Sequence, residues 1–181
     1  MSVSMGVERR LDAWAFGAYT QCMTGFRPMV RRVAKECTGM RVRQVSRLLT
    51  RIYDECLRPL GIQETQFSML VAVAMFGEDG ATMSALASNL VIDRTTLTRN
   101  IVPLEKAGYL RVARSADDAR ARVILLTRSG ERLIESAYPL WEEAQAKIRR
   151  ALGEERFEAL RSQLSEVVTF ADKLSVGAAA E

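Results

Sequence analysis

Apolar residues recur at helical spacing along most of the chain after residue 40. From Val45 to Leu60 they fall at i, i+3, i+4 and i+7, which predicts one long amphipathic helix ended by Pro59 and Gly61. The same spacing predicts further helices over about residues 66–75, 83–90, 94–106, 129–152 and 154–174. Thr82 and Asp93 are suitable N-caps for two of them. These patterns indicate a mainly helical protein.

The spacing changes to alternation over residues 109–127. Two strands, 109–114 and 121–127, and a polar tip at 115–120 predict one hairpin. Because a single hairpin is unstable by itself, it must pack against the helices. The predicted fold class is mainly α with a small β-hairpin wing. The apolar stripes at 45–60 and 157–174 lie outside the hairpin and the short helices before it and need partners, either within the chain or in a second copy.

Residues 1–36 carry the weakest pattern. They mix weakly helical pieces with basic residues, and Pro28 interrupts the spacing. We therefore expect an N-terminal extension with partial helical character before a domain over 37–174, and a short tail over 175–181. Arg43, Arg47 and Arg51 line one face of the helix that follows, which fits either a solvated surface or contact with a DNA backbone.

Composition favours an anionic partner and excludes several kinds of chemistry. The net charge is +4, and the chain has no histidine, so it holds no Ser-His or Cys-His pair and no imidazole zinc ligand. Cys22, Cys37 and Cys56 form no CxxC pair, which predicts no disulfide framework and a reducing cytoplasmic setting. No apolar run is long enough to cross a membrane. With no P-loop or dinucleotide fingerprint either, we predict no catalytic residue, metal or cofactor.

The helix at 94–106 has the side chains of a DNA reader. Its apolar residues Leu97, Ile101 and Leu104 share one face. The residues that point elsewhere are Arg94, Thr95, Thr98, Arg99 and Val102. Threonine lets a helix approach DNA closely, and Arg99 can pair with guanine for about 1–3 kcal/mol of discrimination. The alternative is a polar face that only keeps the protein soluble, but the hairpin adds arginines that suit the adjacent minor groove.

Three stretches resemble the MarR family of regulators. They are the helix-turn-helix segment 83–110, Asp118-Ala-Arg120 before the strand 123–127, and the connection 60–67. The resemblance covers about residues 40–174. It implies a winged helix-turn-helix lobe that binds DNA, at 62–127, together with a helical dimerisation region formed by the helices at 40–60 and 129–174. It places Thr95, Thr96, Thr98 and Arg99 in the major groove beside Arg94, and Arg120 in the minor groove, with Asp118 supporting the wing by an ion pair.

The resemblance also implies partners. We expect a homodimer on a pseudo-palindromic operator in double-stranded DNA, acting as a repressor that a small apolar or phenolic effector relieves. Tyr53, Phe67 and Trp141 would line the effector pocket, or are plain core. Two alternatives stay open: a redox-sensing regulator that uses Cys37, near Lys35 and Arg41, and a non-specific architectural DNA-binding protein.

The chain departs from the family pattern at three positions. Val91 stands where the turn usually has glycine, so its backbone must either avoid the left-handed conformation or tolerate strain. Ala85 replaces a common glutamate, and Pro103 lies late in the recognition helix, where it removes an N–H bond. None of the three is one of the residues expected to face DNA.

Overall fold

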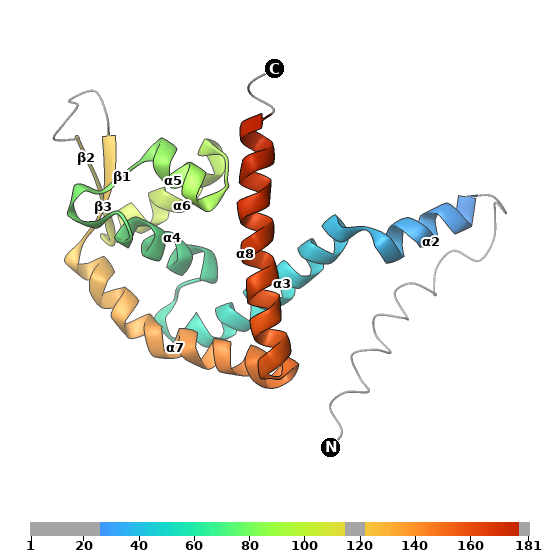
Figure 1. Cartoon of the computed structure of the whole chain (residues 1–181). Coiled ribbons are helices and arrows are strands. Elements are labelled where there is room, and N and C mark those ends of the chain that lie inside the picture. Colours follow the sequence, from blue (N-terminus) through green and yellow to red (C-terminus); the bar gives the residue numbers. More distant parts are fainter. Residues whose placement is uncertain (1–25, 115–121, 178–181) are drawn as a thin grey trace. The chain divides into compact units, whose positions relative to one another are not determined.

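The computed structural model describes residues 26–114 and 122–177, without the side chains of 171–177. The chain divides into two units, residues 1–46 and 47–181, each taken by itself below. In chain order the helices are α2 (Phe26–Glu36), α3 (Thr38–Leu57), η1 (Arg58–Leu60), α4 (Glu64–Ala74), η2 (Gly77–Asp79), α5 (Met83–Leu90), α6 (Arg94–Lys106), α7 (Arg128–Leu152) and α8 (Glu154–Gly177). The strands are β1 (Ala81–Thr82), β2 (Leu110–Arg114) and β3 (Arg122–Leu126) (Figure 1).

The first unit contains α2 and the beginning of α3, and it corrects one expectation. Pro28 does not interrupt a helix, because it lies in the first turn of α2. A backbone N–H in the first turn has no helical acceptor, so proline costs no hydrogen bond there. The Cys37 N–H donates to the Val33 carbonyl at 2.9 Å, and the Arg41 N–H donates to the Cys37 carbonyl at 3.2 Å. Helical hydrogen bonds therefore continue through the single residue that separates α2 from α3.

The second unit has one apolar core beneath its helices and sheet. The fully buried large side chains come from α3, α4, α5, α6, β2 and β3: Leu57, Met69, Leu70, Val73, Leu86, Leu97, Leu104, Leu110 and Ile124. Each such side chain contributes about 1.5–3 kcal/mol when it is removed from water. Because α3, α4, α5, α6 and the sheet all supply residues to this cluster, it holds the helix-turn-helix to the wing.

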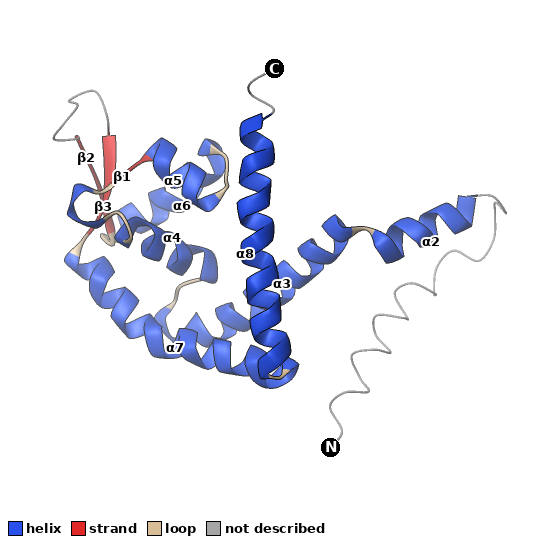
Figure 2. Ribbon diagram, in the orientation of Figure 1, coloured by secondary structure: helices blue, strands red, loops and turns tan. Residues whose placement is uncertain are grey.

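The sheet has three strands in the order β1-β3-β2, and both pairs of neighbours are antiparallel. The strands are red in Figure 2. The predicted hairpin is β2 and β3, with Leu110 opposite Leu126 and Val112 opposite Ile124. The third strand, β1, was not predicted, because two residues are too few to show a period; Ala81 pairs with Ile124. It fixes the start of α5 to the wing.

A tight joint connects the wing to α7. The Thr127 hydroxyl donates to the Gly108 carbonyl at 2.7 Å and accepts from the Gly130 N–H at 3.1 Å, so it caps α7 and ties it to the end of α6. At Gly130 a Cβ atom would meet the Tyr109 carbonyl oxygen and lie 2.6 Å from Leu126 Cδ1. Glycine therefore lets α7 approach the base of the wing.

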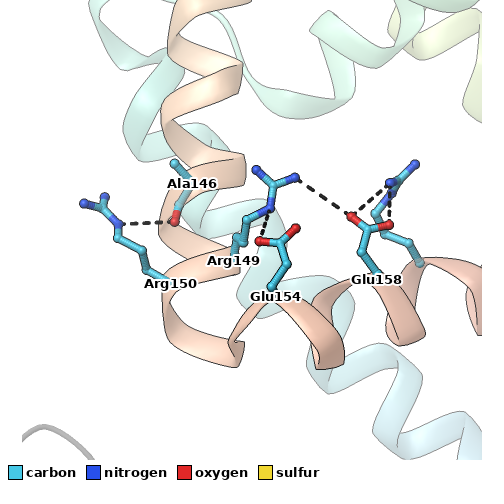
Figure 3. Close-up of polar contacts among 6 residues, drawn as sticks. Ala146, Arg149, Arg150, Glu154 and Glu158 are labelled. Carbon is cyan, nitrogen blue, oxygen red and sulfur yellow. Dashed lines mark hydrogen bonds and ion pairs between the residues drawn. The ribbon is translucent and has the colours of Figure 1, made fainter.

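The corner between α7 and α8 combines ion pairs with a buried aromatic ring (Figure 3). Arg149 Nε lies 3.2 Å from a Glu154 oxygen, although the contact lacks hydrogen-bond geometry, and Arg161 pairs with Glu158 at 3.0 Å. The Arg149 guanidinium also lies 4.7 Å from the centre of the buried Phe157 ring. Such exposed pairs are worth about 0–1 kcal/mol each, so Phe157 supplies most of the stabilisation at this corner.

Candidate nucleic-acid interface

The α5–turn–α6 unit forms where the sequence predicted it. The Thr82 hydroxyl accepts from the Ala85 N–H at 3.1 Å and begins α5. The Ile92 N–H donates to the Ala87 carbonyl at 3.0 Å, and the Val91 N–H to the Ser88 carbonyl at 3.1 Å. This pair of bonds is a Schellman ending, which stops α5 and redirects the chain into α6.

Val91 occupies the left-handed position of that ending. Its φ is 52° and its ψ 46°, and it is the one non-glycine residue with positive φ among those the structure describes. The sequence left two outcomes open at this position, a backbone that avoids the left-handed conformation or one that tolerates strain. The structure shows the strained backbone, which costs about 1–2 kcal/mol. The side chain is 77% exposed, so little packing offsets that cost.

Asp93 caps α6 as predicted. One carboxylate oxygen accepts from the N–H groups of Thr95 at 2.8 Å and Thr96 at 2.9 Å, and the other accepts from the Thr96 hydroxyl at 2.7 Å. The bonds from Thr96 and Thr95 lower the pKa of Asp93 below its ordinary value. The first turn of α6, which carries the residues expected to meet DNA, is thus held by an ionised carboxylate.

The α6 residues expected to contact DNA all lie on its exposed side. Leu97, Ile101 and Leu104 are at most 4% exposed and face the core. The exposed set is Arg94, Thr95, Thr96, Thr98 and Arg99. A helix with this division presents short polar side chains and two guanidinium groups to any duplex that reaches it.

The threonines of α6 differ in what their hydroxyls can do. The Thr96 proton is donated to Asp93, and the Thr98 hydroxyl donates to the Arg94 carbonyl at 2.8 Å. A phosphate oxygen needs a donor, so in this arrangement Thr98 offers an acceptor and a methyl group. That chemistry suits a thymine methyl better than a phosphate.

Pro103 does not end the recognition helix. α6 runs through it to Lys106, and the Ala107 N–H donates to the Pro103 carbonyl at 3.0 Å. Because proline has no N–H, the Arg99 carbonyl four residues earlier lacks its helical donor. The side chain of Pro103 is exposed, so its ring displaces nothing in the core.

The stem of the wing carries three exposed arginines, Arg111, Arg114 and Arg122. Arg114 and Arg122 face each other in the last register pair before the tip. Like charges directly opposite across two strands destabilise a hairpin, so an anion beside them would relieve a repulsion already present. This pair was not among the site residues predicted from the sequence, although the predicted hairpin contained the signal. Arg120 and Asp118 lie outside the described residues.

The three aromatic residues considered for an effector pocket lie in different surroundings. Phe67 is 8% exposed and belongs to the core, and Tyr53 is half-buried, where burial and then Glu64 raise its pKa. Trp141 lines an open hollow of about 440 Å³ at the α7–α8 corner, together with Phe157, Arg149 and Arg161. Of the three, only Trp141 borders that hollow.

The cysteines are not equivalent. Cys37 is half-buried between α2 and α3, while Cys56 is 5% exposed on α3. The Lys147 ammonium group donates to the Cys56 sulfur at 3.3 Å and pairs with Glu143 at 2.8 Å. The hydrogen bond to Glu143, and then that to Cys56, raise the pKa of Lys147. The sequence could not reveal this contact, because the two residues are 91 positions apart.

Other kinds of site are missing from the described part of the chain. Within residues 26–114 and 122–177, no three cysteine or carboxylate groups gather as metal ligands would. None of the helices in these ranges is both long and apolar enough to span a bilayer. The exposed face of α6 and the arginines of the wing are therefore the main candidates for a functional site.

Comparison with known proteins finds similarity to transcriptional regulators. A model of the MarR family matches residues 60–121. The HTH-type transcriptional regulator YwoH of Bacillus subtilis is 30% identical over 94 residues, which are 52% of this chain and 66% of that protein. The chain therefore matches slightly less than two thirds of that relative's length.

Solved structures extend the similarity over most of the chain. The transcriptional regulator MosR of M. tuberculosis, in complex with DNA, is 34% identical and has a TM-score of 0.66; the match covers 77% of this chain and 98% of MosR. A MarR variant of E. coli with operator DNA shares the fold at 23% identity and a TM-score of 0.67, over 75% and 96% of the two chains. The chain thus belongs to the MarR family of winged-helix transcriptional regulators, a family of regulators and not of enzymes.

Proposed function

We propose that the protein is a homodimeric repressor that binds a pseudo-palindromic operator in double-stranded DNA. The observation that carries this proposal is the exposed face of α6, where Arg94, Thr95 and Arg99 stand over a fully buried Leu97. The opposed Arg114 and Arg122 add a second anion-binding element on the wing. The similarity to MosR, which was solved with DNA, supports the same interpretation.

In this proposal α6 enters the major groove and the wing follows the backbone to the minor groove. Arg99 reads a base edge, and Arg94 contacts a phosphate near the start of α6. Arg120, supported by Asp118, enters the minor groove, where a narrow groove concentrates negative potential. Two subunits related by a two-fold axis place their recognition helices about one helical turn of DNA apart.

Genomic footprinting of the purified protein identifies its operator, and the affinity for that duplex and a scrambled one then tests specificity. We expect the operator to be favoured by about 10³ or more at physiological salt. Arg99→Ala should cost about 1–3 kcal/mol on the operator and little on the scrambled duplex. Arg120→Ala should weaken operator binding strongly while the dimer persists. Equal affinity for both duplexes would instead identify a non-specific architectural protein.

The signal that relieves repression is a separate part of the proposal. We place a small apolar or phenolic effector beside Trp141, because this side chain borders the hollow at the α7–α8 corner. Titration with simple phenols, followed by operator release and Trp141 fluorescence, tests it against a Trp141→Leu control. If peroxide treatment releases the wild-type protein from the operator but leaves the Cys37→Ser protein bound, the redox alternative is favoured instead.

A further inference from the structure

A thiol, an amine and a carboxylate form a chain of contacts where α7 meets α3. The Cys56 side chain is 5% exposed, and the Lys147 ammonium group donates to its sulfur at 3.3 Å. The same ammonium group pairs with a Glu143 oxygen at 2.8 Å. Because the Lys147 side chain is 43% exposed and that of Glu143 51%, the lysine connects a buried thiol with the solvent. The proposed DNA interface uses none of these three groups.

This arrangement suits a reaction with hydrogen peroxide. A thiolate attacks a peroxide oxygen, and an ammonium group held against the sulfur favours that charged form. The first product is a sulfenic acid, whose sulfur condenses with a nearby nitrogen. The Lys147 nitrogen already contacts the Cys56 sulfur, and it ends a flexible side chain, so the two atoms can meet without any movement of the backbone.

We propose that hydrogen peroxide joins Cys56 to Lys147 through a sulfur–nitrogen bond, a sulfenamide that fastens α3 to α7. In the first step the sulfur attacks one peroxide oxygen, the O–O bond breaks, and the thiol is oxidised to S–OH while water leaves. In the second step the Lys147 nitrogen loses a proton and attacks the sulfur, the S–O bond breaks, and a second water leaves. The thiol, the ammonium group and one hydrogen peroxide thus give the sulfenamide, two waters and one proton.

Glu143 is a positioning residue for the second step. Its hydrogen bond to Lys147, and then the hydrogen bond to Cys56, raise the pKa of that lysine, so the ammonium form persists while the sulfur is reduced. Oxidation to S–OH removes the negative charge from the sulfur, and the amine form then becomes easier to reach. The Glu143 carboxylate accepts the released proton and, being half exposed, passes it to water.

The bond closes a loop that contains the DNA-binding segment. Its two ends are 91 positions apart, and α4, α5, α6 and the wing lie between them. A covalent link across so long a segment restricts the unfolded chain. We therefore expect the urea midpoint of the treated protein to rise, and a thiol reductant to return it to the untreated value.

Mass spectrometry of the full-length protein after treatment with hydrogen peroxide tests the proposal. A protein with both Cys22→Ser and Cys37→Ser keeps Cys56 as its one cysteine, so it cannot form a disulfide within the chain. Its mass should fall by about 2 Da, the loss of two hydrogen atoms, and a thiol reductant should restore it. Tandem spectra should show the peptide that contains Cys56 joined to the one that contains Lys147.

Two further substitutions in that background separate the steps. Lys147→Arg is the matched control, because it keeps a positive charge beside Glu143 but removes the amine. Its Cys56 should instead proceed to sulfinic acid, a gain of about 32 Da that the reductant does not reverse. Glu143→Gln should slow formation of the link several-fold and leave the rate of sulfenic acid formation, followed by dimedone labelling, unchanged.

Three results would overturn the proposal. They are recovery of Cys56 as a free thiol, its conversion to sulfinic acid while Lys147 is present, and a bond from its sulfur to any other nitrogen. None of them involves the operator or Cys37, so the proposed regulator would stand in each case.

Discussion

The turn between α5 and α6 shows how a single residue sets local strain. Val91 holds a left-handed backbone that β-branched residues adopt at a cost, and its exposed side chain returns little. Glycine adopts this conformation freely but also gains entropy in the unfolded chain, which offsets part of the benefit. The net effect therefore favours glycine by a modest amount.

We predict that Val91→Gly stabilises the protein by about 0.5–1 kcal/mol. Val91→Ala is the control, since it retains a Cβ atom in the left-handed region and should recover only part of that gain. Urea unfolding measures both through the shift in midpoint. A destabilised Val91→Gly protein would mean that the valine side chain makes a contact whose removal outweighs the relief.

Asp93 gives a pH-dependent signature at the start of α6. Its pKa is lowered in the folded protein, so its capping contribution is complete above the ordinary aspartate pKa of about 3.9 and is lost as the pH falls through the lower folded value. Asp93→Asn keeps an oxygen acceptor for the N–H groups but does not titrate. We expect the melting temperatures of the two proteins to converge as the pH is lowered from 5 to 3. Parallel curves across that range would rule out a role for the charge.

Residue patterns predicted some of these details and missed others for a physical reason. The caps at Thr82 and Asp93 are local, because the acceptor and its N–H donors lie within three residues of each other. The contact between Lys147 and Cys56 depends on how α7 crosses α3, and no local pattern records that crossing.

Secondary-structure elements, too, were predicted well where the signals that define them lie close together in the sequence. The bounds of α5 and α6 matched their predicted ranges, since each helix has a polar cap at its start and a Schellman ending or glycine after it. α4 begins at Glu64 and ends at Ala74, against a predicted range of about 66–75, and the chain then tightens into η2. The pairing of β1 with β3 depends on the tertiary fold, and two residues are too few to reveal it.

The joint between the wing and α7 makes a prediction at this scale. Gly130→Ala should destabilise the protein by about 1–3 kcal/mol, even though alanine is the better helix former, because the new Cβ would collide with the Tyr109 carbonyl and Leu126. Gly39→Ala is the matched control in α3. Its Cβ would meet only Arg43 Nη1 at 3.4 Å and Cys37 Sγ at 4.0 Å, so we expect it to be neutral or stabilising by up to about 1 kcal/mol. Equal effects of the two changes in thermal unfolding would contradict the close approach at Gly130.

At the scale of the whole molecule, the exposed apolar stripes matter more than any single contact. The sequence predicted that the stripes over 45–60 and 157–174 need partners, and in the described chain Leu48, Leu164 and Val167 remain 40% or more exposed. Their exposure supports the proposed homodimer, because a monomer would leave these side chains in water. Which copy covers which stripe is a property of the assembly and cannot follow from one sequence.

The salt dependence of operator binding tests two things: whether the wing contacts phosphates, and whether both subunits of the dimer do so. Removing one side chain that neutralises a phosphate should reduce the slope of log K against log salt by about 0.9. In a homodimer every substitution occurs twice, so Arg114→Gln or Arg122→Gln should each reduce the slope by about 2. Arg58→Gln, an exposed arginine of η1 outside the helix-turn-helix and the wing, is the control and should leave the slope unchanged.

The same substitutions should not weaken the fold, because removing one member of the opposed arginine pair relieves repulsion across the hairpin. We therefore expect the urea midpoint to stay level or rise while DNA affinity falls. Fluorescence anisotropy over about 50–200 mM salt, with unfolding measured on the same preparations, checks both parts. A slope change near 1 per arginine would indicate that only one subunit engages the operator, and no change would remove the wing stem from the interface.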